Sequence, residues 1–353
     1  MEHQTILFTN NIDKALDDIL SKISYNRLFV LTDVNTHHFV FPNIANNKYI
    51  SQATIIKIKA GDINKNIESA SYVWKQLADN GATRKSLLIN LGGGVVTDLG
   101  GFAVSTFKRG IPFINIPTTL LGAVDAAIGG KTGINFNSLK NEIGVFNEAI
   151  AVIISTTFFK TLQLTEIKSG FAEMLKHGLL SDKATYEKLI SYDFSSPDTD
   201  YLLDMLKDSI EVKRHIVKED PLEKGLRRAL NLGHTAGHAF ESLAMKQGTP
   251  IPHGYAVAWG LILELILSHI ELDFDSKILY KLSEFIYKNY GAFHISCDDY
   301  DTLIAYMQHD KKSNHGEMNF SLLHNIGDVK IDCDIPVDTV KNALDIYRDL
   351  MHI

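Results

Sequence analysis

The sequence predicts an α/β domain with a mostly parallel sheet over residues 1–160, followed by an all-α domain over residues 161–353. Two observations predict this division. Short β-rich segments alternate with helix-like segments in the first part, as is typical of parallel α/β domains. Long amphipathic patterns dominate the second part, which favours helices. A chain of 353 residues is long enough to bury a core in each domain.

The predicted elements follow from local composition. Six short segments rich in β-branched and aliphatic residues predict strands over 5–8, 28–32, 54–58, 87–91, 113–116 and 151–154. The clearest helical segments between them are 12–22 and 66–80. The amphipathic patterns of the second domain predict helices over 164–180, 199–219, 228–246, 254–271, 275–290 and 336–350.

Composition argues against several classes of function. The net charge of −7 disfavours a general nucleic-acid binder and a protein that adheres to anionic membranes. The two cysteines, Cys297 and Cys333, have no paired spacing, which argues against a disulfide framework and fits a reducing cytoplasm. The first residues lack the basic and apolar regions of a secretory signal. The longest apolar stretch, 257–270, contains Glu264 and His269, so we expect a buried helix there and no membrane span.

A glycine-rich segment, Gly92–Gly94, directly follows the predicted strand 87–91. Glycines at this place let the backbone turn sharply and approach a phosphate group closely. The segments 117–119 and 129–131 add hydroxyls and a lysine near other strand ends, so the three together predict a nucleotide site. The spacing is neither G-x-G-x-x-G nor Walker A, and a tight structural turn is the alternative. Asp33, just past the second strand, fits either a ribose contact or a turn.

A second cluster has the residue types of a divalent-metal site. His234 and His238 are four residues apart, so on a helix they share a face, and Glu241 lies one turn further on it. Glu173 interrupts an apolar helical stripe, and His253 begins the next predicted helix. Imidazoles with one carboxylate suit zinc with an open position for substrate. The alternative is a pair of histidines on a polar helix face.

Taken together, these motifs resemble the 3-dehydroquinate synthase family over residues 28–325, in the order of that family. The motifs that carry the resemblance are Gly92-Gly93-Gly94-Val95-Val96 with Asp98, Arg109-Gly110, Pro117-Thr118-Thr119, Val124-Asp125, Gly129-Gly130-Lys131, Lys140-Asn141, Ala172-Glu173 with Lys176, Gly225-Leu226-Arg227, Asn231, Gly233-His234, Gly237-His238, His253-Gly254 and Asp310-Lys311-Lys312.

The resemblance implies an NAD-binding α/β domain, a helical metal- and substrate-binding domain, and an active site in the cleft between them. It implies that Glu173, His234 and His253 bind a divalent metal, usually zinc with cobalt as an alternative, and that His238 faces substrate instead of the metal. The residues implied around NAD are Asp33, Asn35, Asp62, Lys65, Gly93, Gly94, Val95, Asp98, Thr118, Thr119, Leu121, Lys140, Phe158, Thr161, Leu162 and Glu166. Those implied around substrate are Arg109, Asp125, Lys131, Asn141, Lys176, Lys213, Arg227, Asn231, His238 and Lys312.

The implied reaction converts 3-deoxy-D-arabino-heptulosonate 7-phosphate into 3-dehydroquinate and phosphate in the shikimate pathway. It combines transient oxidation by NAD, phosphate elimination, re-reduction and an intramolecular aldol closure. Two alternatives stay open. One is another enzyme of the same fold, either a different sugar-phosphate cyclase or a metal-dependent polyol dehydrogenase. The other is a catalytically silent NAD-binding module, against which the intact Glu173, His234 and His253 argue.

Four positions depart from the usual pattern of the family: Thr97, Asp62, His177 and Tyr255 stand where glycine, glutamate, tyrosine and glutamate are common. Either Lys311 or Lys312 could reach phosphate. The resemblance also implies a homodimer in which Arg109 reaches the phosphate of the neighbouring subunit.

Overall fold

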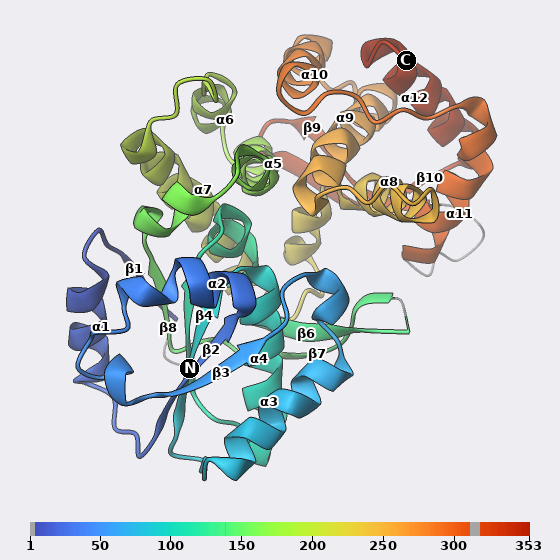
Figure 1. Ribbon diagram of the computed structural model, residues 1–353. Coiled ribbons are helices and arrows are strands. Elements are labelled where there is room, and N and C mark those ends of the chain that lie inside the picture. Colours follow the sequence, from blue (N-terminus) through green and yellow to red (C-terminus); the bar gives the residue numbers. More distant parts are fainter. Residues whose placement is uncertain (1–3, 138, 311–317) are drawn as a thin grey trace. The chain divides into compact units, whose positions relative to one another are not determined.

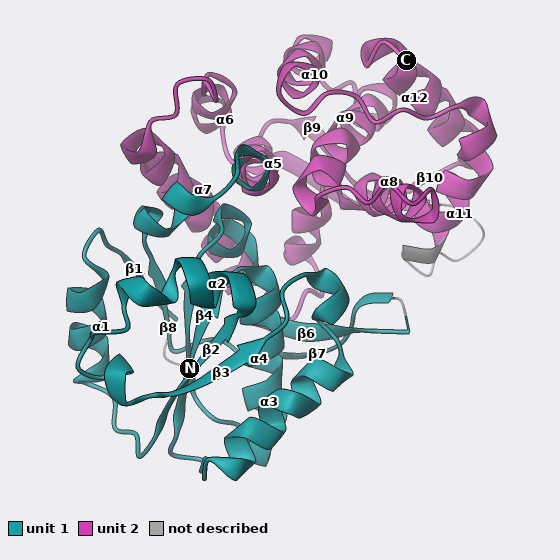
Figure 2. Ribbon diagram, in the orientation of Figure 1, with its two compact units in different colours: residues 1–167 teal, residues 168–353 magenta. Residues whose placement is uncertain are grey.

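The computed structural model describes residues 4–137, 139–310 and 318–353 of the chain. The chain divides into two compact units, unit 1 over residues 1–167 and unit 2 over residues 168–353 (Figure 2). The fold-class prediction is confirmed, since unit 1 is an α/β structure and unit 2 is predominantly helical (Figure 1).

A parallel sheet forms the centre of unit 1 (Figure 1). Within the described residues it has six strands in the order β1-β8-β5-β4-β2-β3, and every neighbouring pair is parallel. Its central strands β4 and β5 are buried on both faces, which explains why their sequences are apolar except for one asparagine in each, Asn90 and Asn115, which hydrogen-bond to each other at 2.9 Å. The strands are β1 (Thr5–Phe8), β2 (Leu28–Asp33), β3 (Thr54–Ile58), β4 (Leu87–Gly92), β5 (Phe113–Pro117) and β8 (Ala151–Ile154).

Two helices cover one face of this sheet. They are α3 (Ile67–Asp79) and α4 (Gly94–Thr106). In the core on this face, Phe29 and Leu31, which are alternate residues of β2, belong to the same buried cluster as Val73 of α3 and Leu99 of α4. The remaining helical segments of unit 1 are α1 (Ile12–Leu20), α2 (Val34–Phe39), the short 3₁₀ turns η1 (Phe41–Asn43), η2 (Ile50–Gln52), η3 (Asp62–Asn64), η4 (Phe107–Arg109) and η6 (Thr156–Thr161), and the π-helical turn η5 (Gly122–Ala126).

An antiparallel hairpin, β6 (Lys131–Phe136) and β7 (Leu139–Phe146), extends from unit 1 and was not predicted from the sequence. Its pairing is irregular, because Ile134 pairs with Ile143 whereas Phe136 pairs with Leu139. Between these two pairs, β7 therefore contains two more residues than β6. The extra residues form a bulge that includes Asn141.

Unit 2 is built mainly from helices. They are α5 (Leu164–Leu180), which begins in unit 1, α6 (Lys183–Ile190), α7 (Thr199–Glu219), α8 (His234–Lys246), α9 (His253–Leu272), α10 (Ser276–Tyr290), α11 (Tyr300–Asp310) and α12 (Val337–Leu350), with the turns η7 (Leu226–Asn231) and η8 (Cys297–Asp299). By length and composition α9 could cross a membrane, but 72% of its most apolar window is buried inside the protein, as expected for a core helix.

Two features of unit 2 differ from the sequence-based expectation. The predicted helix 228–246 is broken, because Gly233 adopts a left-handed backbone (φ +80°) between η7 and α8. The unit also contains an antiparallel hairpin, β9 (Met318–Asn325) and β10 (Asp328–Ile335), beside its helices. Strand β9 is buried along most of its length, so its sequence lacks the alternation that predicts a strand.

Candidate functional site

Three side chains that could hold a metal converge in unit 2, each from a different helix. Glu173 lies in the middle of α5, and His234 and His253 are the first residues of α8 and α9. One ligand atom from each lies within 4.8 Å of the others. The structure therefore brings together the three residues that the sequence analysis named as metal ligands.

Close helix contacts explain why these residues meet. A Cβ on Gly254 would lie 1.9 Å from the carbonyl oxygen of Ser169, so only glycine lets the start of α9 approach α5 this closely. The Gly254 N–H donates to Ser169 Oγ at 3.1 Å. Glu173 lies one turn further along α5 from Ser169, and this contact therefore brings it next to His253.

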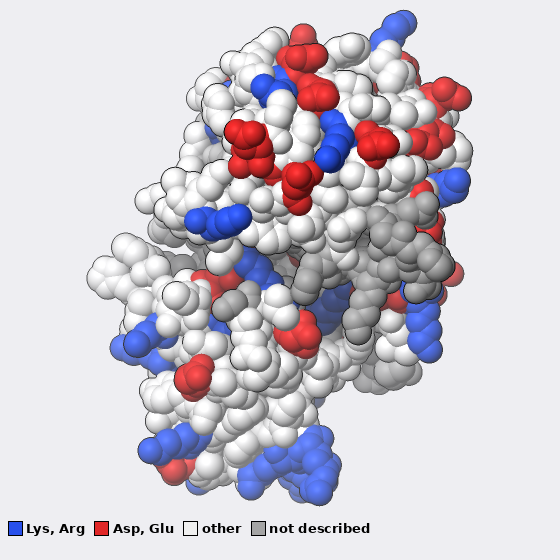
Figure 3. Space-filling view, turned by 90° about the vertical axis from the view of Figure 1, so that its right-hand side faces the viewer, with Lys and Arg blue, Asp and Glu red and all other residues white. Residues whose placement is uncertain are grey.

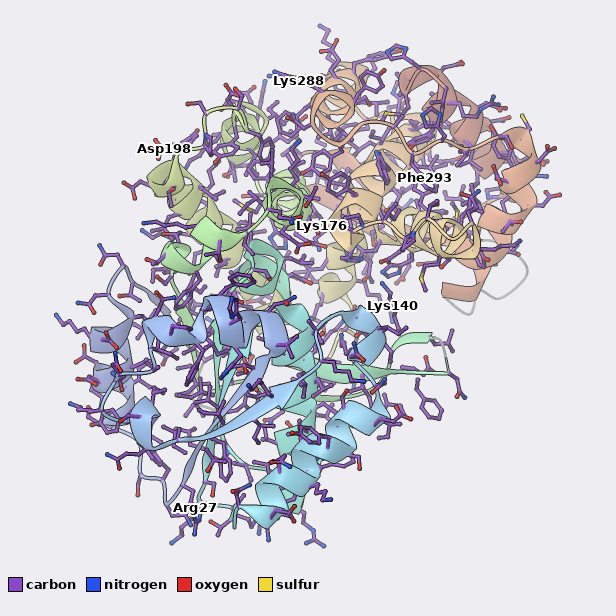
Figure 4. All side chains as sticks on the ribbon, viewed as in Figure 1. Arg27, Lys140, Lys176, Asp198, Lys288 and Phe293 are labelled. Atoms are coloured by element: carbon purple, nitrogen blue, oxygen red, sulfur yellow. The ribbon has the colours of Figure 1, made fainter. Side chains whose placement is uncertain are left out.

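The geometry around Glu173 is that of a ligand set. Its Oε1 lies 3.3 Å from His234 Nε2 and 3.7 Å from His253 Nε2. The side chain is fully buried, yet neither carboxylate oxygen accepts a well-directed hydrogen bond from any described residue. A buried carboxylate lacking such bonds is unfavourable unless a cation compensates it. Lys176 Nζ supplies one cation through an ion pair with Oε2, which leaves Oε1 facing the two imidazoles (Figure 4 marks Lys176 on α5).

The surroundings set the protonation states of the three residues. Burial acts to raise the pKa of Glu173, but the charge of Lys176, together with the contacts with His234 and His253, outweighs it and holds the pKa well below its usual value. Burial and the Lys176 charge lower the pKa of His234 to about 4, so its imidazole is neutral. Burial also acts against charge on His253, but the nearby carboxylates of Glu173 and Glu241 raise its pKa to about 9.

Outer contacts orient both histidines. His234 Nδ1 lies 3.2 Å from the carbonyl oxygen of Leu232, so the N–H is on Nδ1 and the Nε2 lone pair is available. His253 Nδ1 lies 3.5 Å from Glu241 Oε2, on the side of the ring away from Glu173. The sequence placed Glu241 on the same helix face as His234 and His238 but indicated no role for it, because its partner, His253, lies on another helix.

A buried carboxylate also fixes the start of α8. Glu264 Oε2 accepts the Gly233 N–H at 2.6 Å, and its Oε1 accepts the Ala236 N–H at 3.2 Å. These two amides flank His234, so Glu264 holds the backbone that carries this histidine. In the sequence, Glu264 stands out only as an interruption of the apolar stretch 257–270.

Other residues predicted to contact substrate are also found in unit 2. The His238 ring lies 5.4 Å from that of His234 and 5.8 Å from that of His253, measured between centroids. Lys176 is buried beside Glu173. Lys213 on α7 and Arg227 on η7 are buried, and Asn231, the last residue of η7, is half-buried.

In unit 1 the glycine-rich segment joins β4 to α4 as predicted. Gly93 is the N-cap of α4 and has no side chain to cap it. A Cβ on Gly93 would lie 3.0 Å from Thr119 Cγ2, so the segment packs against the Thr118–Thr119 turn, where the Thr118 N–H donates to the Gly92 carbonyl. Asp125 follows in the π-helical turn η5.

A polar network in unit 1 joins residues from two of the predicted sets. Lys65 Nζ donates to Asp98 Oδ2 and to Asn141 Oδ1. Asn135, which the sequence analysis did not name, accepts the Asn141 N–H on its Oδ1 and donates its Nδ2 to Asp62. Lys140 Nζ lies 3.8 Å from Asp62 Oδ2. Lys65, implied around NAD, and Asn141, implied around substrate, are thus in direct contact.

The remaining predicted residues have varied surroundings. Asp33 caps α2, since its carboxylate accepts the Thr36 N–H at 2.8 Å and faces the Thr36 hydroxyl, which agrees with the turn alternative and leaves a ribose contact untested. Arg109 is exposed and has a left-handed backbone (φ +67°). Lys312 lies outside the described residues. Asn35, Lys131, Thr161 and Glu166 are exposed, Gly94, Val95, Leu121 and Leu162 are half-buried, and Phe158 is buried.

Comparisons with known proteins identify the family of this chain. Family models for the 3-dehydroquinate synthase N-terminal and C-terminal regions match residues 55–169 and 170–313. A 3-dehydroquinate synthase from Parabacteroides distasonis is 46% identical over 349 residues, covering 99% of both chains. One from Pyrococcus furiosus is 40% identical over 318 residues, covering 90% of this chain and 92% of its own.

A solved structure supports the fold. The 2-epi-5-epi-valiolone synthase from Streptomyces hygroscopicus, with NAD⁺ and Zn²⁺ bound, has a TM-score of 0.87 and covers 99% of this chain and 98% of its own. The two sequences are 24% identical, so this likeness bears on the fold alone.

Proposed function

This chain belongs to the 3-dehydroquinate synthase family, and from that premise we propose that it converts 3-deoxy-D-arabino-heptulosonate 7-phosphate into 3-dehydroquinate and inorganic phosphate. The observation that carries the proposal is the cluster of the buried Glu173 with the half-buried His234 and His253, whose ligand atoms lie within 4.8 Å of one another. A silent binding module would not need to keep a buried carboxylate directed at two imidazoles.

Glu173, His234 and His253 fit a zinc or cobalt ion, because the buried Glu173 Oε1 lacks a well-directed hydrogen bond among the described residues and both imidazoles face it through Nε2. When bound, the ion supplies Lewis-acid polarisation of the substrate's neighbouring oxygens. Leu232 and Glu241 hold the two imidazoles in the orientation that leaves both Nε2 atoms directed at Glu173.

The Gly92–Gly94 segment fits the pyrophosphate of NAD. Gly93 leaves the first N–H groups of α4 without a side-chain cap, and the helix N-terminus favours negative charge. When bound, NAD⁺ supplies reversible acceptance of a hydride from the substrate. We place the other NAD residues as the resemblance does, with Thr118, Thr119 and Asp98 nearest this segment.

The role of the remaining polar residues is to hold an anion. Lys176, Lys213 and Arg227 are buried in unit 2, and buried cations are favourable where anionic partners meet them. We assign Arg227 and Lys213 to the substrate carboxylate, and Lys131 and Asn141 to its phosphate. We place Asp125, Asn231, His238 and Lys312 around the sugar hydroxyls and phosphate, and name no residue as the sole base for elimination.

Assembly and location form a further part of the proposal. We place the enzyme in the cytoplasm as a homodimer that acts on a small anionic substrate without nucleic acid or membrane. The free thiols of Cys297 and Cys333 support a reducing compartment. Basic and acidic side chains are interspersed on the face shown in Figure 3, which differs from the continuous basic surface of a nucleic-acid binder.

The test measures phosphate release from the heptulosonate 7-phosphate by zinc-loaded protein with substoichiometric NAD⁺. We expect many phosphate ions released per NAD⁺ and no net NADH, because NAD is regenerated in each turnover. The control is Glu173→Gln, which should release none. Stoichiometric NADH would instead indicate a dehydrogenase, and absence of both products with this substrate would contradict the proposed function.

A further inference from the structure

A buried lysine joins three separate segments of unit 1. Lys65, which follows η3, is only 5% exposed. Its Nζ donates to Asp98 Oδ2 on α4 and to Asn141 Oδ1 on β7, each at 2.5 Å. The resemblance assigns Lys65 to NAD and Asn141 to substrate, but it says nothing of a contact between them.

The contact determines which way the Asn141 carboxamide faces. An ammonium group has only donors, so the Asn141 atom that meets Lys65 must be the carbonyl oxygen. The two N–H donors on Nδ2 are therefore turned away from Lys65. Asn141 is exposed, and no described residue accepts a hydrogen bond from Nδ2.

The backbone of Asn141 is fixed as well. The residue lies in the β7 bulge with φ +54°, a left-handed conformation that asparagine adopts more readily than most non-glycine residues. Its N–H donates to Asn135 Oδ1 at 3.0 Å, and Asn135 Nδ2 in turn donates to the carbonyl and carboxylate oxygens of Asp62. Both the backbone and the carbonyl of this side chain are thus held.

We propose that Lys65 is a positioning residue that fixes the Asn141 carboxamide with its Nδ2 donors presented to the substrate phosphate. This inference rests on the proposed function, because it takes the anion to be the phosphate of the heptulosonate. A donor held in place before binding loses less conformational freedom when the anion arrives. Asp98 balances the charge of Lys65, so the lysine can hold the amide without drawing the anion to itself.

A purely structural ion pair between Lys65 and Asp98 is the competing explanation. The two explanations differ in what they predict for ligand discrimination. A structural pair affects all ligands alike through the stability of unit 1, whereas a positioned amide affects only ligands that carry the phosphate. The comparison therefore needs two ligands that differ in that group alone.

The experiment measures dissociation constants calorimetrically, with zinc and NAD⁺ saturating for each variant. One ligand is the phosphonate analogue of the substrate, which cannot eliminate phosphate, and the other is the same sugar acid without the phosphorus group. The variants are Lys65→Met, Asn141→Ala and the double substitution. Lys48→Met is the matched control, because Lys48 pairs with Asp17 at the surface of the same unit.

We expect Lys65→Met to weaken phosphonate binding about tenfold, with phosphate-free binding changed less than about twofold. The double variant should bind no more weakly than Asn141→Ala, because Lys65 acts only through the Asn141 donor that this substitution already removes. Lys65→Arg, which keeps donors, should restore most of the discrimination, and Lys48→Met should leave both constants unchanged. Equal weakening of both ligands by Lys65→Met, or multiplying losses in the double variant, would overturn the inference.

A second measurement, on the wild-type protein, tests the inference if Lys65→Met fails to fold. In the wild-type protein, the Asn141 side-chain ¹⁵N–H resonances should shift with the phosphonate and stay in place with the phosphate-free ligand, and unchanged resonances with both would overturn the inference. Failure of the proposed function is a separate result. It would show as absence of phosphate release by the wild-type protein, whereas the inference alone fails if release is normal and discrimination is unaffected by Lys65→Met.

Discussion

Glu173 is the central residue of the proposed metal site, because it is the buried carboxylate that both histidines approach. Glu173→Gln should lower zinc affinity by more than about 100-fold, which is the upper range for losing a residue that only hydrogen-bonds to a metal ligand. It should also lower the free energy of unfolding by about 3–5 kcal/mol, because Lys176 is 1% exposed and loses the charge that compensates it. Chelator competition and denaturant unfolding measure the two effects.

The control for this prediction is the double variant Glu173→Gln, Lys176→Met, which removes both buried charges. It should recover most of the lost stability while zinc binding stays weak. Wild-type zinc affinity in either variant would contradict the ligand assignment.

The protonation of His253 predicts a pH dependence of metal binding. Its pKa is raised to about 9, so in the metal-free protein it carries a proton at pH 7.5 and must release it to coordinate through Nε2. The pKa values of His234 and Glu173 are lowered, so neither adds a proton. Metal affinity should therefore rise about tenfold per pH unit between pH 7 and 8.

Calorimetry in buffers of different ionisation enthalpy should show about one proton released per metal ion at pH 7.5. Release of none would mean that His253 is already neutral before the metal binds.

Glu241 should strengthen metal binding through His253, since its Oε2 lies 3.5 Å from Nδ1, on the far side of the ring from Glu173. Glu241→Ala removes both the acceptor and its charge, and we expect metal affinity to fall about 10–100-fold. Glu241→Gln keeps an acceptor oxygen and should lose less. Unfolding of the metal-free variants checks for a general loss of stability, and full metal affinity in Glu241→Ala would refute this role.

At the scale of elements, the local sequence determined most strands and helices. The predicted strands 5–8, 54–58 and 151–154 and the helices 164–180 and 199–219 have the same bounds in the structure. Each has either the short apolar composition of a strand or the amphipathic period of a helix. The elements that were missed lack such a pattern.

Three missed elements show the reason. Helix α4 is buried on most sides, so it has no polar face to mark its period. Strand β7 is mostly exposed and bulged, which removes the alternation typical of a half-buried strand. The start of α8 is set by the left-handed Gly233 and the carboxylate of Glu264, a contact between distant parts of the chain.

The contact between α5 and α9 predicts a link between packing and metal binding. In Gly254→Ala the new Cβ would lie 1.9 Å from the Ser169 carbonyl oxygen, so the two helices must separate. We expect a loss of about 1–3 kcal/mol in unfolding free energy, together with weaker metal binding, because Glu173 and His253 lie on these helices.

Gly248→Ala is the matched control for this substitution. Gly248 has φ +75° and no atom within 4 Å of a new Cβ, so alanine there adds backbone strain of about 1–2 kcal/mol without moving a helix. It should leave metal affinity unchanged. Equal metal affinity in the two variants would show that the α5–α9 contact does not position the ligands.

At the scale of the whole molecule, the sequence located the candidate site through types of residue and not through contacts. Residue types suited to zinc named Glu173, His234, His238 and His253, the family resemblance narrowed this set to Glu173, His234 and His253, and the structure places those three together. Glu241 and Asn135 were given no role, because each acts on a partner in another element. Such contacts depend on tertiary packing, which local patterns do not contain.

The proposed dimer gives the exposed Arg109 a role between subunits. Lys108 and Arg109 both have left-handed backbones (φ +50° and +67°) in the turn before β5, and strain of this kind in non-glycine residues is often retained for function. The prediction concerns mixtures of inactive Arg109→Ala and Glu173→Ala chains, after subunit exchange has been verified. If Arg109 reaches the partner's substrate, each mixed dimer has one complete site, and its other site carries both substitutions. Since half of the dimers are mixed at equal amounts, activity should return to about one quarter of the wild-type value. If Arg109 acts within its own chain, both sites of every dimer lack one residue, and no activity should return.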